Sequence, residues 1–207
     1  MAKKIYVVSV GPGSIEYITP LAHKIISEAK YIAGGERNLK PYIDDTKNVF
    51  IIKNNLTKLK IFLLDNIANS PVVLASGDAG FYGILKYLQK EFSKEMLVVI
   101  PGVSSIQIAF ARLSDTWHDA TLLSAHGRPF EDIIPLFGTG KLVVLTDAKN
   151  TPQQLAQHLL EKAIFPIQIV VLNNLTYQDE YIWRGKAQDL ATLEIELHNS
   201  VVVIYNE

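Results

Sequence analysis

Apolar, often β-branched runs alternate along this chain with stretches in which apolar residues recur at every third or fourth position. A short, continuous apolar run is typical of a strand that is buried on both faces of a sheet. The runs therefore predict strands over residues 5–10, 31–33, 48–52, 71–75 and 97–100, and further along over residues 121–124, 141–145, 167–172, 180–185 and 200–205.

Stretches with helical spacing lie between these runs. After the fourth predicted strand, apolar residues from Phe81 to Phe92 follow an i, i+3, i+4, i+7, i+11 pattern, which predicts a helix. Thr19-Pro20 and Thr151-Pro152 each place an N-cap residue before a proline at the first helical position. The predicted helices cover residues 20–29, 56–67, 81–92, 105–113, 131–137 and 152–162.

This alternation of strands and helices predicts an α/β fold with two domains. Residues 114–119 are polar and interrupt the pattern, so we expect an N-terminal α/β domain over residues 1–114 and a C-terminal α/β domain over residues 115–207. Helical patterns become sparse toward the end of the chain. The last strands are therefore expected to be partly antiparallel, which gives the second domain a mixed sheet.

Several predicted strands end in loops of small or polar residues. The carboxyl ends of parallel strands meet at one edge of a sheet, where α/β proteins bind ligands. An ordinary turn is the simpler interpretation of any one loop, and Asp78, Ser104 and Ser105 are each suited to cap a following helix. Their recurrence favours a ligand site. The loops cover residues 11–14, 76–80, 101–105, 146–148 and 173–176.

Composition restricts the functional classes only in part. The 20 Lys and Arg residues nearly balance the 21 Asp and Glu residues, so a net charge of −1 gives no overall attraction to nucleic acid or to an anionic membrane. The first apolar run is too short for a signal peptide, and no apolar stretch is long enough to span a bilayer. Cysteine is absent, which excludes disulfides and thiolate metal sites and fits a cytoplasmic protein.

Familiar nucleotide-binding and catalytic patterns are missing from the sequence. Glu16 stands at the third glycine position of a dinucleotide fingerprint, and neither a G-x-x-x-x-G-K-[ST] phosphate loop nor a G-x-S-x-G elbow occurs. The five histidines are scattered, so we expect no metal site. His126 and Arg128 flank a glycine after a predicted strand. They form either a solvated loop or a pair of groups for an anionic ligand.

Val10-Gly-Pro-Gly13, Ala75-Ser-Gly-Asp-Ala-Gly-Phe-Tyr-Gly83 and Pro101-Gly-Val-Ser-Ser105 occur in this order along the chain. Together they resemble the signature segments of the tetrapyrrole methylase family, and the resemblance covers nearly the whole chain. It implies two α/β domains with an intervening cleft, S-adenosyl-L-methionine bound in that cleft, and a homodimer.

The resemblance also implies cofactor contacts, position by position. Ser14 departs from the family pattern, because many members have an acid there, and Ala79 stands where many have proline. The first departure removes the basis for an acid–base role in that loop, and no catalytic residue is assigned. The implied cofactor contacts are Pro12, Gly77, Asp78, Phe81, Ser104 and Ser105, together with the more loosely matched Thr146, Leu175 and Asn199.

Leu123-Ser-Ala-His-Gly-Arg128 resembles one branch of the family, the methyltransferases that act on C5 of cobalt-precorrin-7 in anaerobic cobalamin biosynthesis. Such a small-molecule tetrapyrrole carries several carboxylates, so His126, Arg128 and Arg37 are expected to bind it. A bacterial two-domain relative methylates both C5 and C15. Since this chain stops at Glu207, C15 methylation and decarboxylation are expected from a separate protein.

Two other interpretations stay open. The first is a different member of the same superfamily: another precorrin methyltransferase, diphthine synthase or the ribosomal RNA ribose methyltransferase. The RNA enzyme should carry a basic face, which a net charge of −1 disfavours. The second is a non-catalytic cofactor-binding module, which glycine-rich strand ends would fit equally well.

Overall fold

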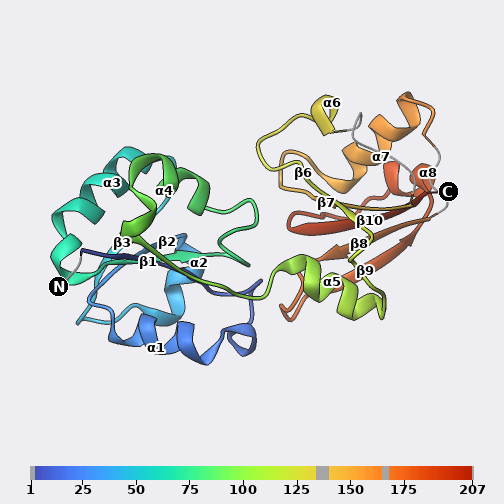
Figure 1. Cartoon of the computed structure of the whole chain (residues 1–207). Helices are drawn as coiled ribbons and strands as arrows, with labels where there is room; N and C mark the ends of the chain where they lie inside the picture. Colours follow the sequence, from blue (N-terminus) through green and yellow to red (C-terminus); the bar gives the residue numbers. More distant parts are fainter. Residues whose placement is uncertain (1–2, 134–139, 165–167, 207) are drawn as a thin grey trace. The chain divides into compact units, whose positions relative to one another are not determined.

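The computed structural model describes residues 3–133, 140–164 and 168–206 of the 207-residue chain. The chain divides into two compact units, Met1–Ser104 and Ser105–Glu207 (Figure 1). Each unit is built on its own sheet, as the sequence predicted. In the described part of the chain, no helix combines the length and the apolar character that crossing a membrane requires.

Within its described residues, the first unit contains a five-stranded sheet in the order β3-β2-β4-β1-β5. Every pairing in this sheet is parallel, so the carboxyl ends of all its strands lie at one edge. The strands are β1 (Ile5–Ser9), β2 (Tyr31–Gly34), β3 (Asn48–Ile51), β4 (Val72–Ala75) and β5 (Leu97–Ile100).

The helices of the first unit cover both faces of this sheet. The connections β1–β2 and β2–β3 run in one direction along the sheet, and β3–β4 and β4–β5 run in the other. Because such crossovers are right-handed, the two directions place helices on opposite faces. Figure 1 shows α3 and α4 on one side of the sheet and α1 on the other. The helices are α1 (Pro20–Glu28), α2 (Glu36–Leu39), α3 (Leu56–Asp65) and α4 (Leu85–Glu91).

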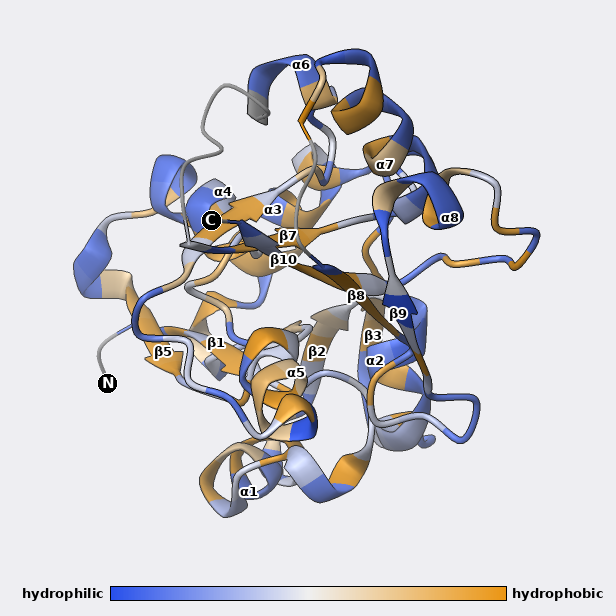
Figure 2. Cartoon of the chain, turned by 90° about the vertical axis from the view of Figure 1, so that its right-hand side faces the viewer, coloured by the Kyte–Doolittle hydropathy of each residue, from blue (hydrophilic) through white to orange (hydrophobic). Residues whose placement is uncertain are grey.

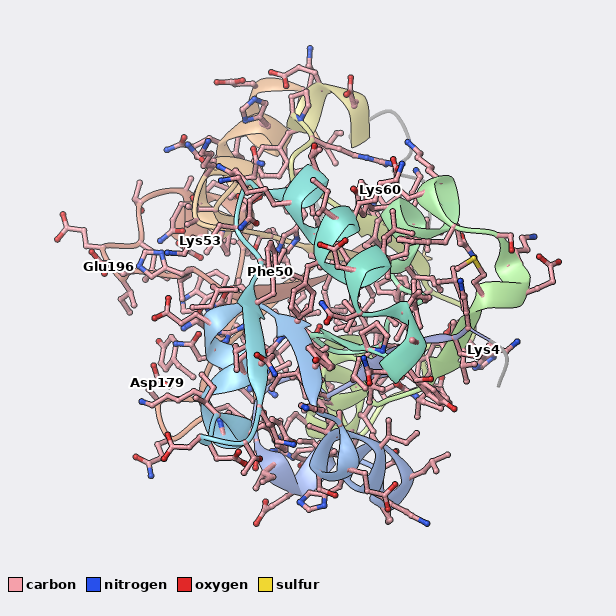
Figure 3. The ribbon with its side chains drawn as sticks, turned by 90° about the vertical axis from the view of Figure 1, so that its left-hand side faces the viewer. Lys4, Phe50, Lys53, Lys60, Asp179 and Glu196 are labelled. Atoms are coloured by element: carbon pink, nitrogen blue, oxygen red, sulfur yellow. The ribbon has the colours of Figure 1, made fainter. Side chains whose placement is uncertain are left out.

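Two apolar clusters fill the first unit, one on each face. Alternate residues of β1 divide between them: Ile5 and Val7 pack in the cluster of α3 and α4, and Val8 packs in the cluster of α1 and α2. At the rim of the first cluster, the rings of Phe50 and Phe62 lie 5.2 Å apart. Figure 3 labels Phe50 on β3 and Lys60 on α3. These contacts explain why the strands of this unit are mainly apolar on both faces.

The second unit has a mixed sheet in the order β6-β7-β10-β8-β9 among its described residues. The β6–β7 pairing is parallel, whereas β10 and β9 run antiparallel to their neighbours, as the sequence predicted. The strands are β6 (Thr121–Ser124), β7 (Gly140–Leu145), β8 (Gln168–Asn173), β9 (Tyr181–Gly185) and β10 (Ser200–Asn206).

One apolar cluster lies between this sheet and three of its helices. The central strands β7, β10 and β8 carry the hydrophobic colours of Figure 2, whereas α6 and α8 show mainly hydrophilic ones. Thr151 caps α7 through a full capping box with Gln154, which confirms the Thr-Pro signal; Thr19 likewise caps α1. The helices of this unit are α5 (Ser105–Leu113), α6 (Phe130–Ile133), α7 (Pro152–Glu161) and α8 (Ala187–Ala191).

The polar stretch expected to separate the domains after residue 114 lies within the second unit, which begins at Ser105. Lys141 at the start of β7 donates to the Asp115 carboxylate (2.9 Å) and to the Asp119 carboxylate (3.2 Å). The Tyr205 hydroxyl of β10 donates to the other Asp115 oxygen at 3.0 Å. These bonds tie the stretch, and α5 before it, to the second sheet.

The helix predicted from Phe81 begins only at Leu85. Tyr82 adopts a positive φ of 51°, which a helix does not accommodate, so residues 81–84 continue the loop. The sequence also gave no indication of α2 and α8, which are too short to show a helical period. Part of the helix predicted over residues 131–137 lies outside the described residues, which support α6 as far as Ile133.

Candidate functional site

The carboxyl edge of the first sheet brings together loops that are far apart in the sequence. β1 and β4 are neighbours, and their onward connections leave over opposite faces. Their ends therefore form the switch point at which open α/β sheets bind ligands. At this point Gly77 N donates to Gly11 O at 2.7 Å, and Gly11 N donates to Gly77 O at 3.2 Å. The first and second signature segments are thus joined backbone to backbone.

Asp78 joins the second signature segment to the third. Its Oδ1 accepts from Gly80 N at 2.8 Å, and its Oδ2 accepts from Gly102 N at 3.0 Å. The sequence suggested that Asp78 could cap the following helix, but the N-cap residue of α4 is Ile84. That suggestion was wrong, because the Asp78 carboxylate accepts hydrogen bonds within its own loop and from the loop after β5. An ionised carboxylate has about four lone-pair positions, so two of them stay available to a ligand.

Ser9 is a polar residue of this edge that the sequence analysis did not single out. It is fully buried on β1, and its Oγ accepts from Ala79 N at 2.9 Å. Close packing surrounds this bond: a Cβ at Gly102 would lie 2.5 Å from Ser9 Cβ and 3.0 Å from Gly77 O. A serine inside an otherwise apolar strand was the sequence signal that could have revealed it.

The other residues expected at this edge lie on the same loops. Pro12, Phe81, Ser104 and Ser105 are half-buried. The Phe81 ring meets the Tyr82 ring edge-on, with centroids 4.8 Å apart. These positions present a partly apolar surface beside backbone and carboxylate hydrogen-bonding groups. The structure therefore gathers at one edge all six positions named for the first domain.

Arg37 lies beyond the end of β2 at the same edge of the first sheet, where it is exposed on α2. β2 is separated from β1 by β4. Arg37 is therefore further along the edge than the signature loops, in a position suited to an extended ligand.

The three residues named in the second unit gather at one edge of its own sheet. β7 and β8 end there and β10 begins there, because β10 is antiparallel to both. Thr146 is buried, and its Oγ1 donates to Ser200 O at 3.0 Å. Asn199 Nδ2 donates to Asn174 Oδ1 at 3.4 Å, and Leu175, which directly follows Asn174, is buried. The structure thus brings Thr146, Leu175 and Asn199 to neighbouring strand ends.

His126 and Arg128 follow β6, whose end lies beside the end of β7 at this same edge of the second sheet. Both residues are exposed. The backbone between them is fixed: Ala125 N donates to Leu145 O at 2.8 Å, and Arg128 N donates to Ala125 O at 3.1 Å. The segment is thus a structured turn with two cationic or polar side chains at its surface.

The chemistry of the first edge is that of binding. The polar groups of its signature loops include backbone amides and carbonyls, the Asp78 carboxylate and serine hydroxyls, which are suited to hold a small polar ligand by hydrogen bonds. Among the described residues there is no group of three or more His, Asp or Glu side chains that could hold a metal ion.

Comparison with known proteins matches the chain to one family. The sequence model described as "Tetrapyrrole (Corrin/Porphyrin) Methylases" matches residues 4–191. A protein of Methanocaldococcus jannaschii named "Probable cobalt-precorrin-7 C(5)-methyltransferase" is 35% identical over 194 residues, which are 90% of this chain and 91% of that protein. The "Cobalt-precorrin-7 C(5)-methyltransferase" of Salmonella typhimurium is 31% identical over 201 residues, 96% of this chain and 97% of the relative.

The fold is also found in solved structures. The uroporphyrin-III C-methyl transferase of Thermus thermophilus, in complex with S-adenosyl homocysteine, superposes with a TM-score of 0.79. It is 18% identical, and the match covers 98% of this chain and 92% of that one. At this identity the likeness concerns the fold. The family match over most of the sequence carries the assignment, and this chain belongs to the tetrapyrrole (corrin/porphyrin) methylase family.

Proposed function

We propose that this chain is an S-adenosyl-L-methionine-dependent methyltransferase that methylates C5 of cobalt-precorrin-7 in cobalamin biosynthesis. Two relatives named for this reaction align with 90% and 96% of the chain, which supports the choice of substrate. The family match over residues 4–191 carries the methyltransferase assignment. The joining of the three signature loops at the β1–β4 switch point, through the Gly11–Gly77 pair and the Asp78 carboxylate, supports a ligand site there.

The hydrogen-bond acceptors and the apolar surface at this edge fit the proposed cofactor. A methionine ammonium and ribose hydroxyls need hydrogen-bond acceptors, which Asp78 and the loop carbonyls supply. An adenine ring needs apolar surface, which the half-buried Phe81 and Pro12 supply. We propose that Pro12, Gly77, Asp78, Phe81, Ser104 and Ser105 bind S-adenosyl-L-methionine.

We extend this proposal to the second unit. Thr146, Leu175 and Asn199 lie together at neighbouring strand ends of its sheet, which supports a shared role in binding the cofactor. Thr146 uses its hydroxyl hydrogen on Ser200 O, so its oxygen lone pairs stay able to accept a hydrogen bond.

The bound cofactor supplies a methyl group that its sulfonium charge has already activated. The part of the protein is then to hold donor and acceptor carbon in line and to keep water away. We propose that His126, Arg128 and Arg37 bind the carboxylates of the macrocycle. A guanidinium group can donate two parallel hydrogen bonds to one carboxylate, and an imidazole N–H can donate one. Their exposure at the sheet edges fits a large substrate that meets the surface.

The test is methyl transfer from methyl-labelled S-adenosyl-L-methionine to cobalt-precorrin-7. We expect the product to gain one methylene unit in mass and to carry the label at C5 in its NMR spectrum. Labelling at another carbon would point to a different precorrin methyltransferase. Cofactor binding without transfer to any precorrin, diphthamide precursor or ribosomal RNA would favour the binding module instead.

The homodimer and the cytoplasmic location stay predictions from the sequence. Sedimentation of the purified chain tests the first. Fractionation of cells that express it tests the second.

A further inference from the structure

The loop that follows β7 bonds to the backbone of the segment His126-Gly127-Arg128 at Gly127 and to the backbone of Ala125, the residue directly before it. Asn150 Nδ2 donates to Ala125 O at 2.8 Å. Gly127 N donates to Asp147 Oδ2 at 3.3 Å. The residues that make these bonds are at least 20 positions away in the sequence. Contacts from a distant part of the chain therefore hold the segment, in addition to its local bonds from Arg128 N to Ala125 O and from His126 N to Ser124 Oγ.

The holding loop is itself braced. Asp147 Oδ1 accepts from Lys149 N at 2.8 Å and from Asn150 N at 2.7 Å, and Asp147 N donates to Asn150 O at 3.1 Å. Partial burial alone would raise the pKa of the Asp147 carboxyl. The backbone N–H groups of Asn150, Lys149 and Gly127 lower this pKa overall, so the side chain is an anion at neutral pH. The Asp147 carboxylate thus accepts hydrogen bonds both from its own turn and from Gly127 of the neighbouring segment.

A solvated surface loop would not need this arrangement. His126 and Arg128 are exposed, yet the backbone of residues 125–127 bonds to Asn150, to Asp147 and to the buried Ser124, whose Oγ accepts from His126 N at 3.2 Å. Fixing the backbone in advance reduces the backbone conformational entropy that the segment loses when its side chains bind a ligand. The arrangement is the one expected beneath side chains that bind a ligand.

We infer that Asp147 and Asn150 are positioning residues, which preset the backbone of His126-Gly127-Arg128 so that both side chains meet carboxylates of the substrate. This inference rests on the proposed function. Neither residue is assigned a contact with the substrate or with the cofactor.

Asp147→Asn separates the two duties of the carboxylate. The side-chain amide oxygen in Asp147→Asn can still accept hydrogen bonds from Lys149 N and Asn150 N. The amide nitrogen then faces the Gly127 N–H, and it cannot accept a hydrogen bond from this group. Asp44→Asn is the matched control. Asp44 Oδ1 accepts from Thr46 N at 2.8 Å in the same kind of turn, far from the segment in sequence. Asn150→Ala removes the bond to Ala125 O and is the second variant, should Asp147→Asn fold poorly.

Two measurements test the inference. The first is amide hydrogen exchange at Gly127, which should accelerate about ten-fold in Asp147→Asn and stay unchanged in Asp44→Asn. The second is steady-state kinetics, in which the KM for cobalt-precorrin-7 should rise about ten-fold in either positioning variant, with kcat nearly unchanged. The dissociation constant for S-adenosylhomocysteine should stay within about two-fold of the wild type.

Adding Asp147→Asn to the variant His126→Ala/Arg128→Ala decides whether Asp147 acts through these two side chains. We expect KM to stay at the value of His126→Ala/Arg128→Ala, because the effect of a positioning residue disappears once the side chains that it positions are removed. An Asp147→Asn effect on KM that adds to the effects of the side-chain variants would overturn the inference. So would an unchanged exchange rate of the Gly127 amide, or an unchanged KM, in Asp147→Asn. If Arg128→Ala and His126→Ala leave KM unchanged in an active enzyme, the inference also fails while the methyltransferase stands. A wild-type chain without methyl transfer would instead overturn the proposed function.

Discussion

The buried Ser9 hydroxyl on β1 accepts a 2.9 Å hydrogen bond from the amide of Ala79, 70 positions along the chain. Ala79 is the residue that directly follows Asp78 in the loop after β4. The bond therefore connects the carboxyl end of β1 to the backbone that carries the proposed cofactor acceptor, and it holds this loop against the first sheet.

Ser9→Ala should lower both stability and cofactor affinity. The change leaves the buried Ala79 N–H without an acceptor, which costs about 1–3 kcal/mol in unfolding free energy. We expect the affinity for S-adenosylhomocysteine in calorimetric titration to fall about ten-fold, since the loop loses its fixed position. Ser124→Ala is the control, because the buried Ser124 also accepts one backbone N–H, from His126. It should cost less stability, because His126 is exposed, and it should leave cofactor affinity unchanged. Equal losses of affinity in the two variants would contradict the prediction.

Gly102→Ala should disturb the same edge by steric overlap. A Cβ at this position would lie 2.5 Å from Ser9 Cβ, so the loop after β5 must move away from β1. We expect a loss of about 1–3 kcal/mol in urea denaturation and weaker binding of S-adenosylhomocysteine. Gly35→Ala is the matched control, because a Cβ there meets nothing within 4 Å. A Gly102→Ala protein as stable as Gly35→Ala would show that the loops are not closely packed in solution.

Asp78 variants separate the bond within its own loop from the bond to the next loop. Asp78→Ala removes the acceptors of both Gly80 N and Gly102 N, whereas Asp78→Asn keeps one oxygen for Gly80 N. We expect both variants to lose at least about ten-fold in affinity for S-adenosylhomocysteine, with Asp78→Ala also losing about 1–3 kcal/mol of stability.

The control for Asp78→Ala is Asp44→Ala. Asp44 makes the same local bond, to Thr46 N at 2.8 Å, in a loop that no signature segment reaches. Its removal should leave cofactor affinity unchanged. Wild-type affinity in a folded Asp78→Ala protein would remove Asp78 from the proposed cofactor site.

The sequence predicted the fold well where strands are continuously apolar. β1 and β4 are buried on both faces, so their composition alone identifies them. It failed at Phe81 to Ile84, where apolar residues have helical spacing but belong to a loop. The spacing describes only where apolar residues stand along the chain, so it cannot show that Tyr82 adopts a positive φ. Tertiary contacts decide that conformation.

The candidate site was predicted less completely, for a related reason. The signature segments indicated which loops meet, but not which atoms join them. That Asp78 bonds to Gly102 N, or that Lys141 draws residues 115–119 into the second unit, depends on contacts between residues distant in sequence. Ser9 and Asp147 were overlooked because a serine in a strand and an aspartate after one are common. Only their partners reveal their roles.

A pH-dependent contribution to stability is expected from His158 on α7. Its Nδ1 lies 3.0 Å from Gln154 O, and its Nε2 lies 3.1 Å from the Glu131 carboxylate on α6. Partial burial alone would lower the pKa of His158, but the bonds to Gln154 and Glu131 raise it overall. Both neighbours are acceptors, so both ring nitrogens must carry a hydrogen, which favours the imidazolium form.

A raised pKa in the folded state means that the folded protein holds this proton more tightly than the unfolded chain does. The resulting stabilisation is fully present below the ordinary histidine pKa of about 6.5 and is lost as pH rises through the higher folded value. We expect Glu131→Gln to destabilise the protein near pH 6 and to have little effect near pH 9, as measured by urea denaturation across this range. In His158→Gln the pH dependence of the Glu131→Gln effect should vanish. A Glu131→Gln effect that is constant with pH, or that persists in His158→Gln, would show that the two side chains are not paired.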